Sequence, residues 1–277
     1  MPGRRRRLDA ELVRRDLVSS RTEAQEAIAA GLVTVDGAPA LKPATQVLPS
    51  QAVVVLGPPR RFVSRGGEKL VGALEAFGID PTRRRCLDAG ISTGGFTDCL
   101  LQHGAGSVFA VDVGYGQVHE RLRRDPRVEI RERTNVRELT PADVPPPAPD
   151  LLVADLSFIS LALVLPVLSR LVADRSQALL LVKPQFEAHR DDVGRGGVVR
   201  DPRAWRGALS RVVGTLSSLG WRLGGVRPSP LLGPAGNVEF LVYAARGIQP
   251  TDGIDVDQAL DAAVAAGQAL RSREEES

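Results

Sequence analysis

Lysine is rare in this sequence, and two of its lysines stand where a proton could be moved. Only three of the 36 basic residues are Lys, and these are Lys42, Lys69 and Lys183. Arg is a permanently charged planar fork, whereas Lys is a compact ammonium that loses its proton more readily when buried. A lysine retained in an arginine-rich chain therefore indicates a position that Arg does not suit. Chance retention of exposed lysines is the alternative, and the neighbouring residues must decide between the two.

Two carboxylates accompany these lysines at the ends of apolar segments. Asp155 ends one predicted strand, Lys183 ends the next, and Glu239 opens a third. Because neighbouring parallel strands end at one edge of a sheet, Asp155 and Lys183 are expected side by side. Lys69, on a predicted helix over 68–77, could reach the same cleft. Two cations and two carboxylates could orient a hydroxyl group and remove its proton, whereas an internal network of ion pairs is the alternative.

A glycine-rich turn follows the first strand of this part of the chain, in the segment LDAGISTGGF at 87–96. Glycine lets the backbone turn tightly and approach a ligand, and the next helix presents free N–H donors at its start. The segment lacks the G-x-G-x-x-G spacing of a dinucleotide site, which disfavours a dehydrogenase. It suits S-adenosyl-L-methionine, which carries an amino acid and a sulfonium. The expected cofactor contacts in this turn are Asp88, Gly90, Ser92, Thr93, Gly94, Gly95 and Phe96.

The next two strands add further candidate cofactor contacts. Asp112, followed by Val113, ends the second strand, where an acid can accept hydrogen bonds from ribose hydroxyls. Capping of the following turn is its alternative role. Asn135, after the third strand, could flank an adenine, although Asn is also an ordinary turn residue. With Asp155 at the same edge, these residues complete the predicted cofactor site.

These residues require a sheet of short strands with helices between them. Strands are predicted at 86–89, 108–113, 128–133, 151–156, 178–183, 221–226 and 238–244. Helices are predicted at 68–77, 95–103, 118–124, 161–173 and 202–219. This alternation predicts an α/β domain with a mostly parallel, seven-stranded sheet and helices on both faces.

The front of the chain predicts a separate, small α+β module. Apolar residues at helical spacing from Leu8 to Leu17 indicate one helix, and Ser20 is the predicted N-cap of a second, which ends at Gly31. Asp36-Gly37 between apolar segments is a strong hairpin signal. The run GPP at 57–59 then predicts a linker.

Charge is unevenly distributed along the chain, although the net charge is only +3. Residues 1–21 hold seven Arg and three acids, which predicts a polyanionic partner, while residues 250–277 hold seven acids and two Arg. Such an acidic tail is usually a solvated helix or a disordered end. Cys86 and Cys99 lack metal-ligand spacing, so no metal is predicted, and unpaired cysteines fit a reducing cytoplasm. We see neither a signal peptide nor an apolar segment of about 20 residues that could span a membrane.

Eight segments together resemble one family. They are VSRGGEKL, LDAGISTGGFTD, VDVGYGQ, RTNVREL, VADLSFISL, LVKPQFE, GRGGVVRD and GNVEFL. They are similar to the TlyA family of ribosomal RNA 2'-O-methyltransferases, in which an S4 RNA-binding domain precedes a Rossmann-like, class I, FtsJ-like methyltransferase domain. The front module resembles S4 through RLD at 7–9, Arg14-Arg15, SR at 20–21 and the segment ending Asp36-Gly37. The resemblance spans the chain to about Tyr243.

The resemblance implies a catalytic tetrad of Lys69, Asp155, Lys183 and Glu239, with Lys183 as the base or the group that orients the hydroxyl. It implies an S4-like domain at 1–57, a linker at 58–63, a catalytic domain at 64–247 and an acidic tail at 248–277. It also implies S-adenosyl-L-methionine as cofactor and cytidines of small- or large-subunit rRNA as substrate. We further expect a cytoplasmic monomer.

The predicted RNA contacts are arginines of the front module, some of which are expected to lie on solvated helix faces. They would hold phosphates of ribosomal RNA and ribosomal subunits rather than recognise bases. These are Arg4, Arg6, Arg7, Arg14, Arg15 and Arg21. Two alternatives remain: a hemolysin-like membrane-active protein, since the family has also been associated with haemolysis, and a non-catalytic RNA-binding factor in ribosome assembly.

Overall fold

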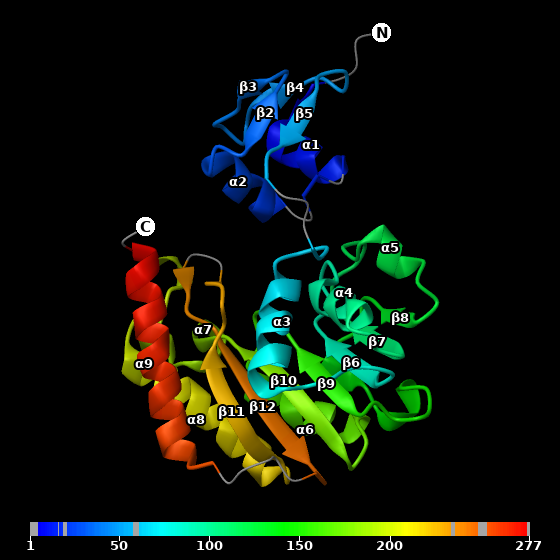
Figure 1. Cartoon of the computed structure of the whole chain (residues 1–277), viewed down its shortest axis with the longest axis vertical. Coiled ribbons are helices and arrows are strands. Elements are labelled where there is room, and N and C mark those ends of the chain that lie inside the picture. Colours follow the sequence, from blue (N-terminus) through cyan, green and yellow to red (C-terminus); the bar gives the residue numbers. More distant parts are fainter. Residues whose placement is uncertain are drawn as a thin grey trace. The chain divides into compact units, whose positions relative to one another are not determined.

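The computed structural model describes residues 5–15, 17–18, 21–57, 61–233, 236–248 and 254–275. These residues belong to two compact units, Met1–Ser64 and Arg65–Ser277, which we describe separately (Figure 1). Three expectations from the sequence fall outside the described residues: Arg4, the N-cap at Ser20, and the first part of the linker.

The first unit packs two helices against short strands. An apolar core holds them together, because helical spacing places Leu8, Leu12 and Ile28 on buried faces where they meet Val33 and Val47. Its elements are β1 (Arg6–Arg7), α1 (Leu8–Arg14), α2 (Arg21–Ala29), β2 (Val33–Val35), β3 (Ala38–Pro39), β4 (Gln46–Val47) and β5 (Val53–Val55). Strands β3, β2 and β5 form one sheet, and β1 pairs with β4.

The predicted hairpin of this unit is present. Val35 pairs with Ala38, so Asp36 and Gly37 form a two-residue turn. Both have positive φ, +49° and +82°. A type I′ turn needs positive φ at both positions, which Asp and Gly tolerate better than other residues.

The second unit is a seven-stranded sheet between helices, as predicted. Its strands are β6 (Arg85–Ala89), β7 (Ser107–Val111), β8 (Val128–Arg131), β9 (Leu151–Ala154), β10 (Ser176–Val182), β11 (Arg222–Pro228) and β12 (Phe240–Arg246). The order is β11-β12-β10-β9-β6-β7-β8. The five strands from β10 to β8 are parallel, and β12 runs antiparallel to both β10 and β11.

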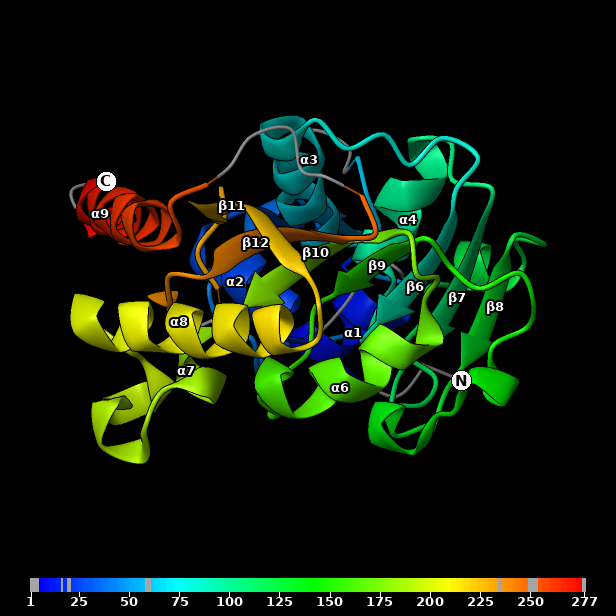
Figure 2. The same cartoon turned by 90° about the horizontal axis from the view of Figure 1, so that it is seen from below.

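Helices cover both faces of this sheet (Figure 2). Helices α3 (Gly66–Phe77) and α4 (Gly95–Gln102) lie on one face, and α6 (Leu161–Leu171) and α8 (Pro202–Ser218) lie on the other. Every residue of β9 is buried, which explains why the strand is a continuous apolar run rather than an alternating one. Two elements are single turns, α5 (Glu120–Arg123) and α7 (Pro184–Glu187). The helix predicted over 118–124 is thus shorter than expected, because His119 already acts as its N-cap.

The acidic C-terminal segment contains a long helix, α9 (Val256–Glu275), with one buried face. Leu260, Ala263 and Val264 are buried in the core of the second unit. Gly267 continues this stripe, and a Cβ there would lie 3.1 Å from side-chain atoms of Phe240 and Val238. The helix therefore packs against β11 and α8, with Gly267 beside Phe240 of β12, rather than being solvated all round. No helix in the described part of the chain is long and apolar enough to cross a membrane.

Candidate active site

Four charged side chains meet at one edge of the sheet because of strand register. Asp155 directly follows β9, and Lys183 directly follows β10, whose residue Leu180 pairs with Ala154. Glu239 directly precedes β12, and Val182 pairs with Phe240. Lys69 lies in the first turn of α3. The sequence-predicted tetrad therefore gathers at the carboxyl ends of the parallel strands.

Lys69 and Glu239 form a buried ion pair. Lys69 Nζ donates a short hydrogen bond to Glu239 Oε2, and the exposed fractions of the two side chains are 8% and 0%. Among the described residues, no group donates to Glu239 Oε1. A Cβ on Gly233 would collide with that oxygen, so a glycine is needed beside the carboxylate. The pair is held where water has little access.

Lys183 has two partners at the same edge. Its Nζ lies 2.6 Å from Asp155 Oδ1, and it donates a 2.9 Å hydrogen bond to Ser157 Oγ. The contact with Asp155 is an ion pair without hydrogen-bond alignment, since Oδ1 accepts no hydrogen bond among the described residues. The side chain of Lys183 is 10% exposed and that of Asp155 is 23% exposed. This pair is therefore more open to a ligand than the first.

The glycine turn brings β6 against the loop that follows β9. Gly90 has a φ of +94°, and a Cβ there would lie 2.5 Å from the carbonyl oxygen of Asp155. Gly94, with a φ of +102°, precedes α4 as its N-cap. Glycine is required at Gly90 by both conformation and space. The close approach of Gly90 holds the backbone of Asp155 in place.

A cavity of about 520 Å³ opens beside this turn. Six of the predicted cofactor contacts line it: Gly90, Ser92, Asp112, Val113, Asn135 and Asp155. The other five, Asp88, Thr93, Gly94, Gly95 and Phe96, are not among its lining residues. The cavity wall also includes Gly114, Gln117, Thr134 and the segment 156–159, which sequence reasoning missed although VADLSFISL was among the family segments.

Asp88 lies beneath the glycine turn and is fully buried. Thr97 Oγ1 donates to its Oδ2 at 2.6 Å, while Oδ1 accepts no hydrogen bond from the described residues. Burial raises the pKa of Asp88 to about 7. A buried carboxyl with an unused oxygen fits a ligand that brings a hydrogen-bond donor.

Asp112 and Asn135 both perform the local roles that were their alternatives. Asp112 accepts hydrogen bonds from the backbone N–H groups of Ser92 at 2.8 Å and Gly114 at 2.7 Å. Asn135 Oδ1 accepts from the N–H of Arg137. Each carboxylate oxygen of Asp112 retains a second lone pair, so turn capping and ligand binding are compatible.

The arginines of the first unit surround two buried acids. Arg7 and Arg21 each bind Asp9 at 2.9 Å, and Arg14 binds Glu11 at 2.6 Å. The guanidinium of Arg7 holds the pKa of Asp9 well below its usual range, and Arg14 is the main cause that lowers the pKa of Glu11 to about 2. The three guanidinium groups are each about half exposed, which leaves donors available to another anion.

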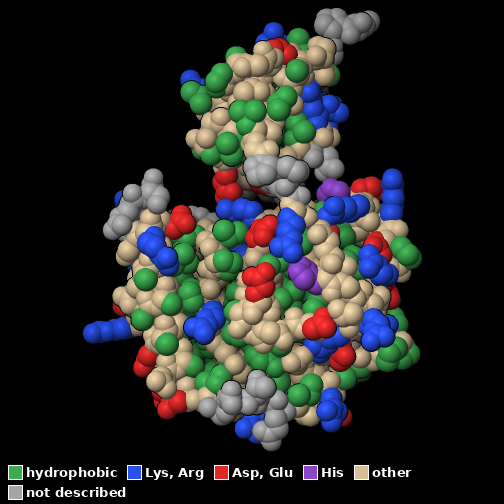
Figure 3. Space-filling view, viewed as in Figure 1, with side chains coloured by type: hydrophobic (Ala, Val, Ile, Leu, Met, Phe, Trp, Pro, Cys, Tyr) green, Lys and Arg blue, Asp and Glu red, His purple; other side chains and the backbone are tan. Residues whose placement is uncertain are grey.

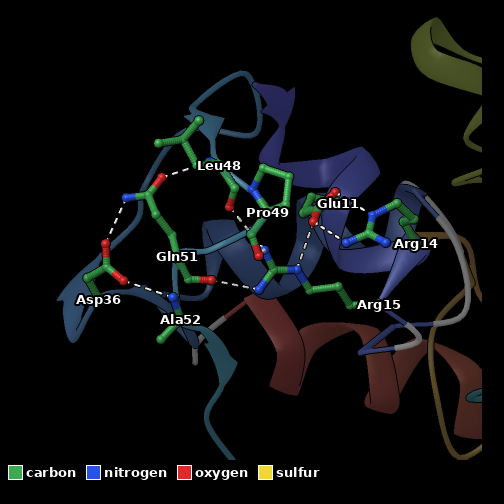
Figure 4. Close-up of polar contacts among 8 residues, drawn as sticks. All are labelled: Glu11, Arg14, Arg15, Asp36, Leu48, Pro49, Gln51 and Ala52. Carbon is green, nitrogen blue, oxygen red and sulfur yellow. Dashed lines mark hydrogen bonds and ion pairs between the residues drawn. The ribbon is translucent and has the colours of Figure 1, made fainter. Parts of the chain in front are cut away.

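Arg15 is different, because its donors are used within the unit. It binds Glu11 at 2.8 Å and donates to the carbonyl oxygens of Gln51, Leu48 and Pro49 (Figure 4). Its side chain is 19% exposed. Arg15 therefore anchors the loop after β4, and its contacts argue against the predicted role as an RNA contact.

Basic residues of the second unit do not gather on the face seen in Figure 3. Lys and Arg side chains are scattered there among Asp and Glu side chains. On this face, mixed charge offers no broad basic patch to a polyanion.

Two family models match the chain, one over each of its two units. A model described as FtsJ-like methyltransferase matches residues 62–246, and a model described as S4 domain matches residues 6–53. The 16S/23S rRNA (cytidine-2'-O)-methyltransferase TlyA of Mycobacterium tuberculosis is 54% identical over 242 residues, which cover 87% of this chain and 90% of the relative.

Other relatives carry hemolysin names. Hemolysin A of Brachyspira hyodysenteriae is 37% identical, and the match covers 86% of this chain and 98% of the relative. A solved structure from Streptococcus thermophilus with a provisional hemolysin name is 36% identical, with a TM-score of 0.81 and 99% of each chain covered. With both domain models matched and this identity to named relatives, the chain belongs to the TlyA family, whose members join an S4 domain to an FtsJ-like methyltransferase domain.

Proposed function

We propose that this protein transfers a methyl group from S-adenosyl-L-methionine to the ribose 2'-hydroxyl of a cytidine in ribosomal RNA. The observation that carries the proposal is the pair of Lys–carboxylate contacts at the sheet edge, beside a cavity of cofactor size. The 54% identical relative is named for this activity.

The cavity residues fit the proposed cofactor. Gly90 and Ser92 line the cavity, and Asp112 and Asn135 supply polar side chains to its wall. We keep Asp88 as a proposed cofactor contact because one oxygen of its buried carboxyl accepts no hydrogen bond among the described residues, although Asp88 does not itself line the cavity. When bound, S-adenosyl-L-methionine supplies an electrophilic methyl group on a sulfonium.

Lys183 is the group that meets the hydroxyl. In its neutral form its Nζ would take the proton of the ribose 2'-hydroxyl as the oxygen bonds to the methyl group and the bond from sulfur to that methyl group breaks, which leaves a neutral thioether. Asp155, 2.6 Å away, then stabilises the ammonium, and Ser157 keeps Nζ in place. Because the methyl group is already activated, holding the 2'-hydroxyl in line with it contributes more to the rate than making the hydroxyl a stronger nucleophile.

Lys69 and Glu239 have a positioning role in this proposal. Their ion pair is nearly closed to water, so Glu239 fixes where Lys69 directs its remaining N–H donors. Those donors would hold the ribose or a neighbouring phosphate. With both lysines charged, the two pairs carry no net charge, so the cleft then repels neither the cationic cofactor nor the anionic RNA.

In this proposal the first unit binds the RNA. We propose phosphate contacts by Arg6, Arg7, Arg14 and Arg21, which are exposed or half-exposed, and a structural role for Arg15. We also propose that the catalytic domain extends through α9, since that helix packs against β11 and α8 and contributes to the core of the second unit.

The test is methyl transfer to isolated ribosomal subunits that lack the modification, followed by mapping of 2'-O-methyl sites. Lys183→Ala is expected to lower turnover by at least about 100-fold with little change in cofactor affinity. Lys42→Ala is the matched control, because Lys42 is exposed and far along the chain from the tetrad. Absence of transfer by the wild-type protein would favour the assembly-factor alternative instead.

A further inference from the structure

Two loops leave the carboxyl edge of the sheet and are joined along their length. The loop at 156–160 follows β9, and the segment at 183–187 follows β10. At one end Lys183 donates to Ser157 Oγ, and in the middle the rings of Phe158 and Phe186 lie 5.3 Å apart between centroids. At the other end both loops converge on Glu187.

Glu187 is a buried carboxylate at this far end. It is 2% exposed, and it accepts hydrogen bonds from Ser160 Oγ at 2.6 Å and from the backbone N–H of Leu161 at 2.5 Å. In the described part of the chain it forms no ion pair, and burial raises its pKa. Burying a carboxylate is costly unless its oxygens are hydrogen-bonded, so both of these bonds matter for its place in the fold.

The partners of Glu187 show that it does more than accept a hydrogen bond from the first turn of α6. Ser160 is the N-cap of α6, yet its side chain makes no capping bond to the helix and donates to Glu187 instead. The acceptor for the first N–H of α6 thus comes from 26 residues further along the chain. A local cap would have sufficed for the helix alone. A distant cap additionally fixes the two loops relative to each other.

The loop between these anchors holds an unfavourable conformation. Phe158 has a φ of +65° and is 91% exposed, so its own side chain gains little from burial. A bulky residue in this region persists only where the surrounding contacts determine the backbone. Two contacts hold the backbone on either side of Phe158. After it, Ser160 donates to the buried Glu187, and before it, Ser157 accepts from Lys183.

We propose that Glu187 is a positioning residue for methyl transfer: it fixes the loop at 156–160 so that Ser157 Oγ holds Lys183 Nζ beside Asp155. This inference rests on the proposed function. It assigns Glu187 no contact with substrate or cofactor. Its effect on turnover passes through the hydroxyl of Ser157.

The test is a double-mutant cycle on turnover with Glu187→Ala and Ser157→Ala, measured with saturating cofactor and ribosomal subunits. Each single change is expected to lower kcat about 10-fold, and the double variant little more than either, because both remove the same support. Glu187→Gln keeps an acceptor for one of the two donors, so an intermediate kcat is expected. If Glu187→Ala fails to fold, Glu187→Gln replaces it in the cycle.

Ser169→Ala is the matched control on the same helix. Ser169 is buried near the end of α6 and accepts hydrogen bonds from Trp221 Nε1 and Arg246. Both Ser169→Ala and Glu187→Ala should lower the unfolding midpoint, but only Ser169→Ala should leave kcat at the wild-type value. If wild-type protein methylates subunits but Glu187→Ala and Glu187→Gln retain full kcat, or the cycle is additive, the positioning role is overturned. If wild-type protein methylates nothing, the proposed function fails first.

Discussion

The tetrad of the second unit and the arginines of the first unit pair cations with buried acids in different ways. In the Lys69–Glu239 pair of the tetrad both partners are buried, with exposed fractions of 8% and 0%. In the first unit only the acid is buried: Arg21 is 58% exposed beside Asp9, which is 0% exposed. Burial of both groups fixes a geometry, whereas burial of the acid alone anchors a cation that can still meet an outside partner.

The largest expected effect is on stability, from Glu239→Ala. Lys69 would then keep a buried charge without a partner, a loss of about 3–5 kcal/mol in the free energy of unfolding. Asp9→Ala is the matched change in the first unit, and it should cost less because the exposed Arg7 and Arg21 can turn to water. Urea unfolding of both variants measures the difference. Equal losses would show that the two kinds of pair do not differ.

Lys183→Arg separates charge from proton handling. Arg retains the cation near Asp155 but does not give up its proton, so turnover is expected to fall about 100-fold. Arg21→Lys, the reciprocal exchange in the first unit, should leave turnover within about twofold under saturating RNA, since either side chain can meet a phosphate. Single-turnover methylation of ribosomal subunits measures both. Comparable activity of Lys183→Arg and wild type would remove Lys183 from its proposed role.

Removal of half-exposed guanidinium groups should weaken RNA binding moderately. Arg14→Ala and Arg21→Ala are each expected to reduce affinity several-fold and to lower the magnitude of the salt slope by about 1. Arg206→Ala is the control, because Arg206 pairs with Asp257 and Asp261 on the surface of the second unit. Filter binding at several salt concentrations tests this. A salt response that is the same in all three variants contradicts the proposed contacts.

The last comparison concerns pH, where two buried carboxyls should change stability in opposite directions. The pKa of Asp88 is raised to about 7, so the folded state holds a proton that the unfolded state has lost, and stability falls as pH rises from about 4 to about 7. The pKa of Asp9 is lowered, so its contribution is instead lost as pH falls below about 4.

The slope from Asp88 should reach about 1 kcal/mol per pH unit near pH 5 to 6. Asp88→Asn should flatten it, while Asp9→Asn should flatten only the acid limb. Unfolding of each variant across this pH range measures the two slopes. An unchanged slope in Asp88→Asn would show that this carboxyl is ionised in the folded protein.

Much of the second unit could be predicted because its strands are buried on both faces. Continuous apolar runs such as Leu151–Ala154 mark the strands, and the polar residue after each run marks the shared edge. Asp155 and Lys183 were found in this way. Lys69 and Glu239 do not follow a parallel strand; the sequence suggested that they could reach the same cleft, and the family resemblance gave all four residues a catalytic role.

Contacts set by distant parts of the chain could not be predicted. Nothing in the residue spacing around Arg15 predicts that its hydrogen-bond acceptors lie 33 to 36 residues away. The acidic residues of α9 led to the expectation of a solvated tail, although the helix also has apolar residues that are buried in the core. The glycine turn was recognised, but the sequence did not show that Gly90 and Ser92 line the cavity while Thr93 and Phe96 do not. Which side of a tight turn faces a cavity depends on backbone angles that the residue types alone do not determine.

The position of β12 has a consequence for how the protein is made. This strand is the last in sequence, yet it lies between β10 and β11, and the residue before it is the partner of Lys69, 170 positions earlier. Contacts of such long range form late in folding. During synthesis the second unit therefore has no complete site until nearly the whole chain has emerged. A nascent or truncated chain that ends before β12 is expected to be inactive, because it lacks the strand that holds Glu239 beside Lys69.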